Sequence, residues 1–143
     1  IRVDDYLEEV DRMASEIGAS IPEQAGTPRK VEAVAAYLFK DNGFHGSRSD
    51  YYNRSNSYLN EVIDDREGIP LTLSLLFVEL ARRVGAEIHG LGLPGHFAAC
   101  YEADGKRIII DPFEGGVTMS TEDADALLFN AGIGGNAAVF CFH

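Results

Sequence analysis

The fold is decided by residues 87–113, which read EIHGLGLPGHFAACYEADGKRIIIDPF. Short, mostly apolar runs at 87–93, 96–101 and 107–113 predict three β-strands. Asp104-Gly105 lies between the second and third runs and is a residue pair typical of a two-residue hairpin turn. The stretch therefore predicts an antiparallel meander.

A two-residue turn at Asp104-Gly105 also fixes which residues face each other across the hairpin. It sets Ala98 opposite Asp111, and His96 lies two residues before Ala98 on the same face. Such diagonal neighbours have Cα atoms about 7–8 Å apart, which long polar side chains can bridge. We therefore expect the Asp111 carboxylate to hold one imidazole nitrogen of His96, either as part of a catalytic site or as a structural hydrogen bond.

Upstream of the meander, apolar residues recur every three or four positions, the period of an amphipathic helix. Helices of this kind are predicted at 2–17, 28–41 and 57–66. A fourth, at 70–84, is apolar around nearly its whole circumference, which predicts a central helix buried on all sides. Residues 44–56 have no period and predict an ordered loop. A short helix at 122–129 and a last strand at 139–142 complete the pattern, which is that of an α+β fold.

Composition bounds the class of protein. The 143 residues suit a single domain, residues 1–143, and 45% of them are apolar. The net charge of −11 disfavours nucleic acid and anionic membranes as partners. No apolar run is long enough to span a bilayer and no leader is visible, so we expect a cytoplasmic protein. The chain starts at Ile1 without Met, which suggests a piece of a longer protein.

The two cysteines, Cys100 and Cys141, have no CxxC spacing and lie in apolar surroundings. We expect reduced, buried thiols and no zinc site. A metal site built on His96 and Asp111 is disfavoured because only one histidine is well placed. No cofactor is expected.

No cysteine stands at the start of the 70–84 helix, where a dipole would favour a thiolate. Cys100 is four residues beyond His96 on one strand, about 13 Å away, too far for direct proton transfer. The available hydroxyls are those of Thr72 and Ser74, which at this position cap a helix or bond back to it more often than they attack a substrate.

Four ordered motifs then carry a resemblance: Asn56–Val62, Gly68–Ser74, Leu93–Phe97 and Ile110–Gly116. Together they resemble the SirB-type branch of the transglutaminase-like superfamily, over about residues 50–116. The resemblance implies a papain-like fold in which a central helix carries the nucleophile position and a sheet carries His and Asp. His96 and Asp111 match the second and third positions of that triad.

The resemblance also implies two losses of classical chemistry. Gly68-Ile69-Pro70 stands where active members have GxC, which puts Pro70 at the nucleophile position, and the SirB-type branch is similar in lacking the cysteine. Relatives tend to carry an arginine where Cys100 stands here. The binding cleft implied by the resemblance is lined by Asn56, Asn60, Pro70 and Ser74, although the two asparagines also suit helix capping.

Two functions compete on this reading. The first is a non-enzymatic binding or regulatory module that holds an unknown peptide or protein partner in a cleft with the His96–Asp111 pair. The second is a hydrolase or acyl-transfer enzyme in which His96, oriented by Asp111, activates water or the hydroxyl of Thr72 or Ser74.

Overall fold

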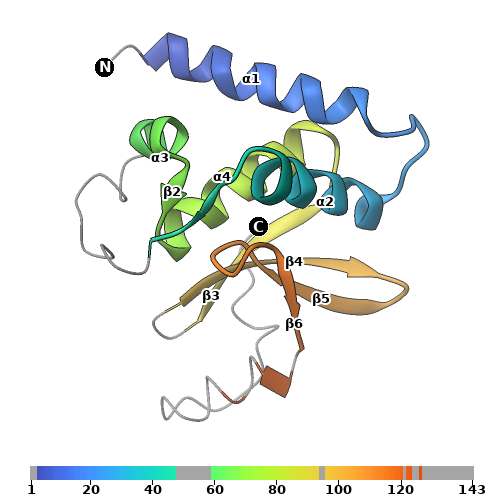
Figure 1. Cartoon of the computed structure of the whole chain (residues 1–143). Coiled ribbons are helices and arrows are strands. Elements are labelled where there is room, and N and C mark those ends of the chain that lie inside the picture. Colours follow the sequence, from blue (N-terminus) through green and yellow to red (C-terminus); the bar gives the residue numbers. More distant parts are fainter. Residues whose placement is uncertain (1–2, 48–58, 94–95, 121, 124–125, 127–143) are drawn as a thin grey trace.

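The computed structural model describes residues 3–47, 59–93, 96–120, 122–123 and 126. In this part of the chain the fold has three layers: α1 lies across α2, α3 and α4, and of these α4 and α2 pack on a four-stranded sheet (Figure 1). The helices are α1 (Val3–Ala19), α2 (Thr27–Ala35), its π-helical continuation η1 (Ala36–Asp41), α3 (Leu59–Asp65) and α4 (Pro70–Arg83). The strands are β1 (His45–Gly46), β2 (Glu67–Gly68), β3 (Ile88–Leu93), β4 (His96–Ala103), β5 (Lys106–Asp111) and β6 (Val117–Met119). None of the described helices is both long and apolar enough to cross a bilayer.

The α+β class and the meander are confirmed. The sheet has the order β3-β4-β5-β6 with antiparallel neighbours throughout. Asp104 and Gly105 have φ angles of 53° and 75°, the left-handed pair that a two-residue type I′ turn requires. Ala99 lies opposite Ile110 and Ala103 opposite Lys106, which is the predicted register. Strand β6, which follows the Asp111 loop, was not predicted.

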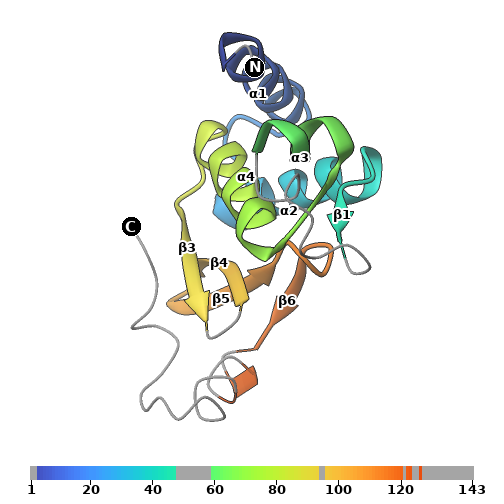
Figure 2. The ribbon, with the colours of Figure 1, turned by 90° about the vertical axis from the view of Figure 1, so that its left-hand side faces the viewer.

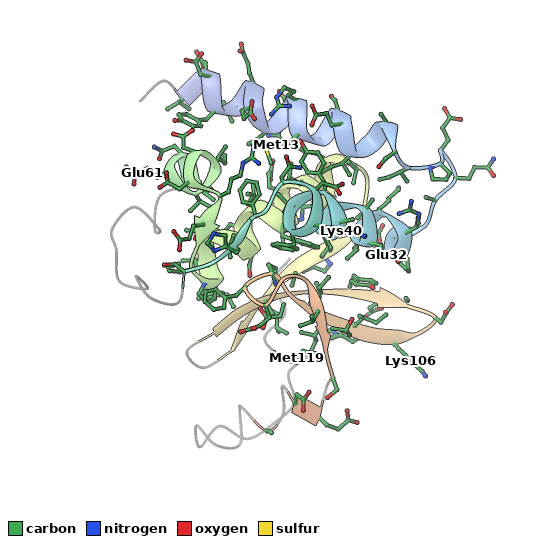
Figure 3. The ribbon with its side chains drawn as sticks, in the orientation of Figure 1. Met13, Glu32, Lys40, Glu61, Lys106 and Met119 are labelled. Carbon is green, nitrogen blue, oxygen red and sulfur yellow. The ribbon has the colours of Figure 1, made fainter. Side chains whose placement is uncertain are left out.

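The core lies between α4 and one face of the sheet, with α1 and α2 closing it from the other side. Phe77 and Leu80 of α4 are fully buried, and Ile110 packs with them from the sheet. The Phe77 ring stacks on Phe39 with centroids 6.0 Å apart. Met13 lies between α1 and the helices beneath it (Figure 3). The core therefore fixes α4 against β3 and β4, which positions the candidate site.

The prediction that α4 is buried on all sides is wrong for one stripe. Leu71 and Leu75 are 39% and 49% exposed, whereas Leu76 and Leu80 are buried. The apolar pattern did not reveal this because it counts side chains around the helix and not the neighbours available to cover them. One apolar stripe of the central helix is thus uncovered in the part of the chain that the structure describes.

A two-residue parallel pair, β1 with β2, joins the loop region to the start of α4. Gly46 lies opposite Gly68, and the Ser47 N–H donates to the Gly68 carbonyl at 2.9 Å. Strand β1 lies on the right-hand side of the helices in Figure 2. The predicted loop at 44–56 therefore contains a strand in its described part. Strands of two residues are too short to show a period in sequence.

Other boundaries differ slightly from expectation. Helix α2 begins at Thr27 with Gly26 at the cap position, and the Thr27 hydroxyl accepts from the Glu87 N–H at 3.4 Å. Strand β5 ends at Asp111 rather than at Phe113. The strand predicted at 139–142 and most of the helix predicted at 122–129 lie outside the described residues.

The expectation of a reduced thiol is wrong for Cys100, which is buried and disulfide-bonded. The chain's other cysteine, Cys141, lies outside the described residues. A run of apolar neighbours gives no information on the oxidation state of sulfur, which is why composition alone misled.

Candidate functional site

The first turn of α4 contains no thiol, and its hydroxyl group is already used. Pro70 occupies the first helical turn and is buried. The Ile69 N–H donates to Thr72 Oγ1 at 3.1 Å, and the Thr72 hydroxyl donates back to the Ile69 carbonyl at 3.3 Å. A Cβ on Gly68 would lie 2.9 Å from Thr72 Oγ1, so the backbone packs closely there. Thr72 therefore acts as a helix cap, the alternative weighed against its role as a nucleophile.

Ser74 ties α4 to the sheet beside the candidate histidine. Its buried hydroxyl donates to the Phe97 carbonyl at 3.2 Å. Phe97 directly follows His96 in β4, so this bond fixes the start of β4 against α4. It also means that the Ser74 hydroxyl would lose a buried hydrogen bond if it turned towards a substrate.

Asp111 is held at the end of β5 by an Asx turn. Its side chain is 3% exposed, and Oδ1 accepts from the Phe113 N–H at 3.0 Å and from the Glu114 N–H at 3.3 Å. Its carbonyl oxygen accepts from the Gly116 N–H at 2.8 Å. Backbone N–H groups thus meet a buried carboxylate and fix its orientation.

The loop after Asp111 is wedged between β1 and the α2–η1 helix. The Phe113 ring lies on Gly46 so closely that a Cβ there would be 2.6 Å from a ring carbon. A Cβ on Gly116 would be 3.1 Å from Ala35 Cβ. Through Gly46, which pairs with Gly68, the Asp111 loop is coupled to the first turn of α4. The structure therefore gathers two of the sequence motifs, Gly68–Ser74 and Ile110–Gly116, at one edge of the sheet.

His96 is the first residue of β4, opposite Leu93 in the ladder. Its side chain lies outside what the structure describes, so its contact with Asp111 stays a prediction. Strand alternation puts Asp111 on the sheet face of Ile109 and Cys100, opposite to the face of Ile110 that packs on α4. Thr72 and Ser74 lie on the α4 side.

A hollow of about 260 Å³ begins at this edge and runs along α4. Two of its polar lining residues, Ser74 and Arg82, are eight residues apart on the helix and so about 12 Å apart along its axis. Gly90, which has no side chain, leaves room on the sheet side. The lining residues are otherwise mainly apolar: Leu71, Leu75, Val78, Phe97 and Ala98.

Arg82 lies in the last turn of α4, where a cation complements the helix dipole. In the structure its Nε donates to the Ile88 carbonyl at 3.1 Å and its guanidinium lies 3.5 Å from His89 Nδ1. Among the described residues no carboxylate forms an ion pair with it, unlike the neighbouring Arg83. A helical period could have placed Arg82 one turn from Val78, on the same side as the hollow.

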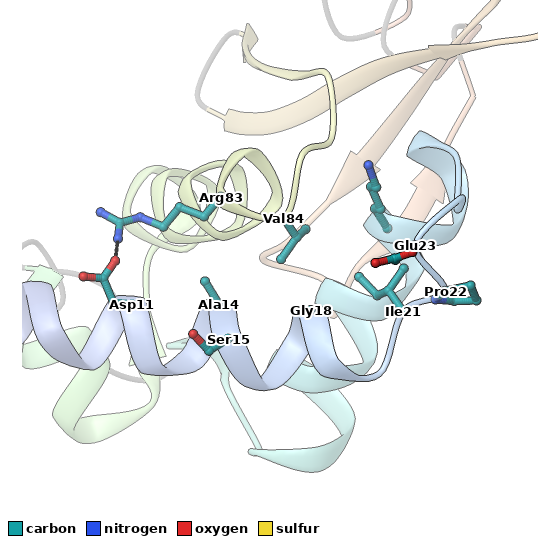
Figure 4. Close-up of a pocket in the computed structure, with 10 residues that line it drawn as sticks. Asp11, Ala14, Ser15, Gly18, Ile21, Pro22, Glu23, Arg83 and Val84 are labelled. Atoms are coloured by element: carbon teal, nitrogen blue, oxygen red, sulfur yellow. Dashed lines mark hydrogen bonds and ion pairs between the residues drawn. The ribbon is translucent and has the colours of Figure 1, made fainter.

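Of the two asparagines predicted in the cleft, the structure describes Asn60, which lies elsewhere. Asn60 lines a separate hollow between α1, α3 and α4, on the other side of Leu75, and Asn56 lies outside the described residues. A wider hollow of about 520 Å³, between α1 and the C-terminal end of α4, is crossed by the Asp11–Arg83 ion pair (Figure 4). It lies a helix length, about 20 Å, from the first turn of α4, and so is separate from the candidate site.

Comparison with known proteins places these motifs in context. A sequence profile described as the transglutaminase-like superfamily matches residues 4–139. A UPF0162 protein of Xylella fastidiosa is 40% identical over 96 residues, which cover 67% of this chain and 34% of that protein. F-box only protein 21 of Mus musculus is 32% identical over 106 residues, covering 68% of this chain and 17% of that protein.

A more distant UPF0162 protein, from Vibrio cholerae, is 27% identical over 108 residues, which are 75% of this chain and 40% of that protein. The chain thus spans about a third of the length of its bacterial relatives and less of the F-box protein. No solved structure matches.

Proposed function

Because the chain belongs to the transglutaminase-like superfamily, yet has proline where the resemblance puts the nucleophile, we propose that it is a binding module and not a thiol enzyme. In this proposal a partner binds at the sheet edge where α4 and β4 begin and β5 ends. The His96–Asp111 pair supplies the polar contact. Assignment to the SirB-type branch, which rests on the motif resemblance, belongs to the same proposal.

The observation that carries the proposal is that both hydroxyls near the missing thiol are engaged. Thr72 caps its own helix and Ser74 holds Phe97. Strand alternation turns Asp111 to the face opposite these hydroxyls, so an imidazole paired with Asp111 is poorly placed to deprotonate them. A buried hydroxyl that leaves such a bond costs about 1–3 kcal/mol, which further disfavours attack.

The hollow along α4 supports a short extended peptide as the class of partner. About four residues of strand span the 12 Å between Ser74 and Arg82. Its lining favours an apolar side chain, and Arg82 at the far end favours an acidic one. The peptide leaves the hollow at the sheet edge, where His96, oriented by Asp111, binds its backbone or a polar side chain.

Two measurements test the proposal. The first is turnover of generic amide, ester and glutamine-donor substrates by the purified chain. We expect no rate above buffer, and no difference between the wild type and His96→Ala. Turnover that His96→Ala abolishes overturns the proposal and establishes the alternative, a hydrolase or acyl-transfer enzyme.

The second measurement is binding of an arrayed peptide library, followed by fluorescence anisotropy of the best binders. We expect selected peptides to carry an apolar residue and an acidic residue about three positions apart. Arg82→Gln should weaken them at least five-fold, while Arg29→Gln, an exposed arginine on α2, should not. Selection with no apolar–acidic pattern, or equal effects of the two variants, contradicts the site.

Nucleic acid and membranes are not among the proposed partners, because ordered acidic helices dominate the charge of −11. A cytoplasmic location is also part of the proposal. The disulfide-bonded Cys100 argues against it, since such bonds are rare in the cytosol. Thiol trapping in intact cells decides the point, because a cytoplasmic chain should be trapped with reduced cysteines.

A further inference from the structure

The hollow between α1, α3 and α4 is a second surface, which shares Leu75 but no other lining residue with the proposed peptide site. It has a volume of about 370 Å³ and its lining is almost entirely apolar. Four of its lining side chains are 41–63% exposed: Val3, Leu7, Leu59 and Leu75. Singly exposed apolar residues are ordinary, but four that line one groove from three helices form a continuous patch of the kind that binds a partner.

The charge around this groove is one-sided. Helices α1, α3 and α4 together carry ten acidic and three basic residues. Two of those three basic residues are already neutralised: Arg12 pairs with Glu9 and Glu16, and Arg83 pairs with Asp11 and Glu79. The third is Arg82, which lies at the other hollow.

The acidic side chains lie on both sides of the apolar floor. Glu79 of α4 lines the groove itself, and Asp64 of α3 accepts a hydrogen bond from Tyr6 at its edge. Glu61 projects from α3 at the rim (Figure 3). The surface thus has an apolar floor and an acidic rim.

We propose that this groove binds an amphipathic helix with basic flanks, supplied by a partner protein. A helix fits because α1 exposes its groove residues over positions 3–10, two turns or about 10 Å, and a docking helix presents apolar side chains at a similar spacing. Basic flanks fit because lysine and arginine on either side of the apolar stripe meet the acidic rim. A second copy of this chain fits poorly, because its own amphipathic helix α1 carries six acids and one arginine and would meet like charge.

The test uses the whole chain and a synthetic, fluorescent 18-residue peptide with leucines at i, i+3, i+4 and i+7 and lysines on both flanks. Two matched peptides accompany it: one with glutamates in place of the lysines, and one with the same composition scrambled so that the leucines lose their helical period. We expect the basic amphipathic peptide to bind at least ten-fold more tightly than either, by anisotropy at 150 mM salt. Equal binding of the scrambled peptide overturns the proposal, since attraction to an acidic protein then explains the result.

Variants of the chain locate the site. Leu59→Lys, in the groove and not among the residues that line the peptide hollow, should weaken binding of the basic amphipathic peptide at least ten-fold, and Leu7→Lys on a different helix should do the same. Val117→Lys, an exposed apolar residue on β6, is the matched control and should change affinity less than two-fold. Circular dichroism melts identify any variant that fails to fold. Because the two groove variants lie on different helices, the second variant still tests the groove if the first does not fold.

Two further outcomes contradict the proposal. If the control variant weakens binding as much as the groove variants, the peptide binds elsewhere. If sedimentation velocity at high concentration shows a dimer that Leu7→Lys disperses, the groove binds a second copy of the chain and not a basic helix.

Discussion

Replacing Gly46 with alanine should destabilise the protein, although alanine usually stabilises relative to glycine. A Cβ on Gly46 would lie 2.6 Å from Cε1 of Phe113 and 2.8 Å from two other ring atoms. Carbon atoms in contact are normally 3.5–4.0 Å apart, so the ring or strand β1 must move by about 1 Å. Phe113 is buried at its other edge, which leaves the ring little room to yield.

The magnitude follows from two opposing effects. Overpacking of a well-filled site costs about 1–3 kcal/mol. Loss of glycine's freedom in the unfolded chain returns about 0.4–1 kcal/mol. We expect Gly46→Ala to lower the free energy of unfolding by about 1–2 kcal/mol, which for a chain of this length lowers Tm by roughly 3–8 °C.

The assay is thermal and urea unfolding followed by circular dichroism, with Gly18→Ala as the matched control. Gly18 lies in α1, where an added Cβ would have no atom within 4 Å, so alanine there should stabilise by up to about 1 kcal/mol. In a Phe113→Leu background, Gly46→Ala should cost at least 0.5 kcal/mol less, roughly the smallest coupling that neighbours in contact show. An unchanged or raised Tm for Gly46→Ala, or no coupling to Phe113, would refute the contact.

Three other outcomes are expected. Leu80→Ala, at a fully buried site on α4, should lower the free energy of unfolding by about 2–5 kcal/mol. Leu75→Ala, on the uncovered stripe, should lower it by no more than about 1 kcal/mol. Equal losses for the two variants in urea unfolding would mean that the stripe is covered. Burial and a hydrogen bond to Glu16 raise the pKa of Tyr37 to about 12. The folded pKa exceeds the unfolded value of about 10, so this contribution to stability is complete below pH 10 and is lost as pH rises towards 12; absorbance titration should show a late tyrosine step that Tyr37→Phe removes. Cys100 should give no thiol reaction in the denatured, unreduced protein, and a stoichiometric reaction would contradict the disulfide.

The sheet was predictable because its signals are local. Asp104-Gly105 specifies the turn, the turn specifies the register, and the register lies within a few residues of the signal. Helices with a 3.6-residue period were placed equally well. The β1–β2 pair was not predictable, because it joins Gly46 to Gly68 through two residues each and leaves no pattern in either segment.

The candidate site could be predicted only where the type of a single residue indicates its chemical role. Asp111 at the end of an apolar strand indicated a carboxylate that holds His96; the structure gives the carboxylate backbone N–H donors, and its contact with His96 stays a prediction. The roles of Thr72 and Ser74 could not be decided from sequence, because a hydroxyl residue at the start of a helix can either cap the helix or act as a nucleophile. The role of Arg82 at the hollow depends on contacts between α4 and β3, which neither segment shows alone.

The parallel pairing of Gly46 with Gly68 has a consequence for how this protein can vary. The segment between Gly46 and Gly68 begins and ends at neighbouring points of the fold, since paired strands are about 4.8 Å apart. The intervening segment is therefore an excursion with both ends tethered. Doubling its length would cost only about 0.6 kcal/mol in closure entropy. Insertions between Ser47 and Leu59 should be accepted readily, which makes this excursion the natural place for lineages, or engineers, to graft new binding sequences beside an unchanged core.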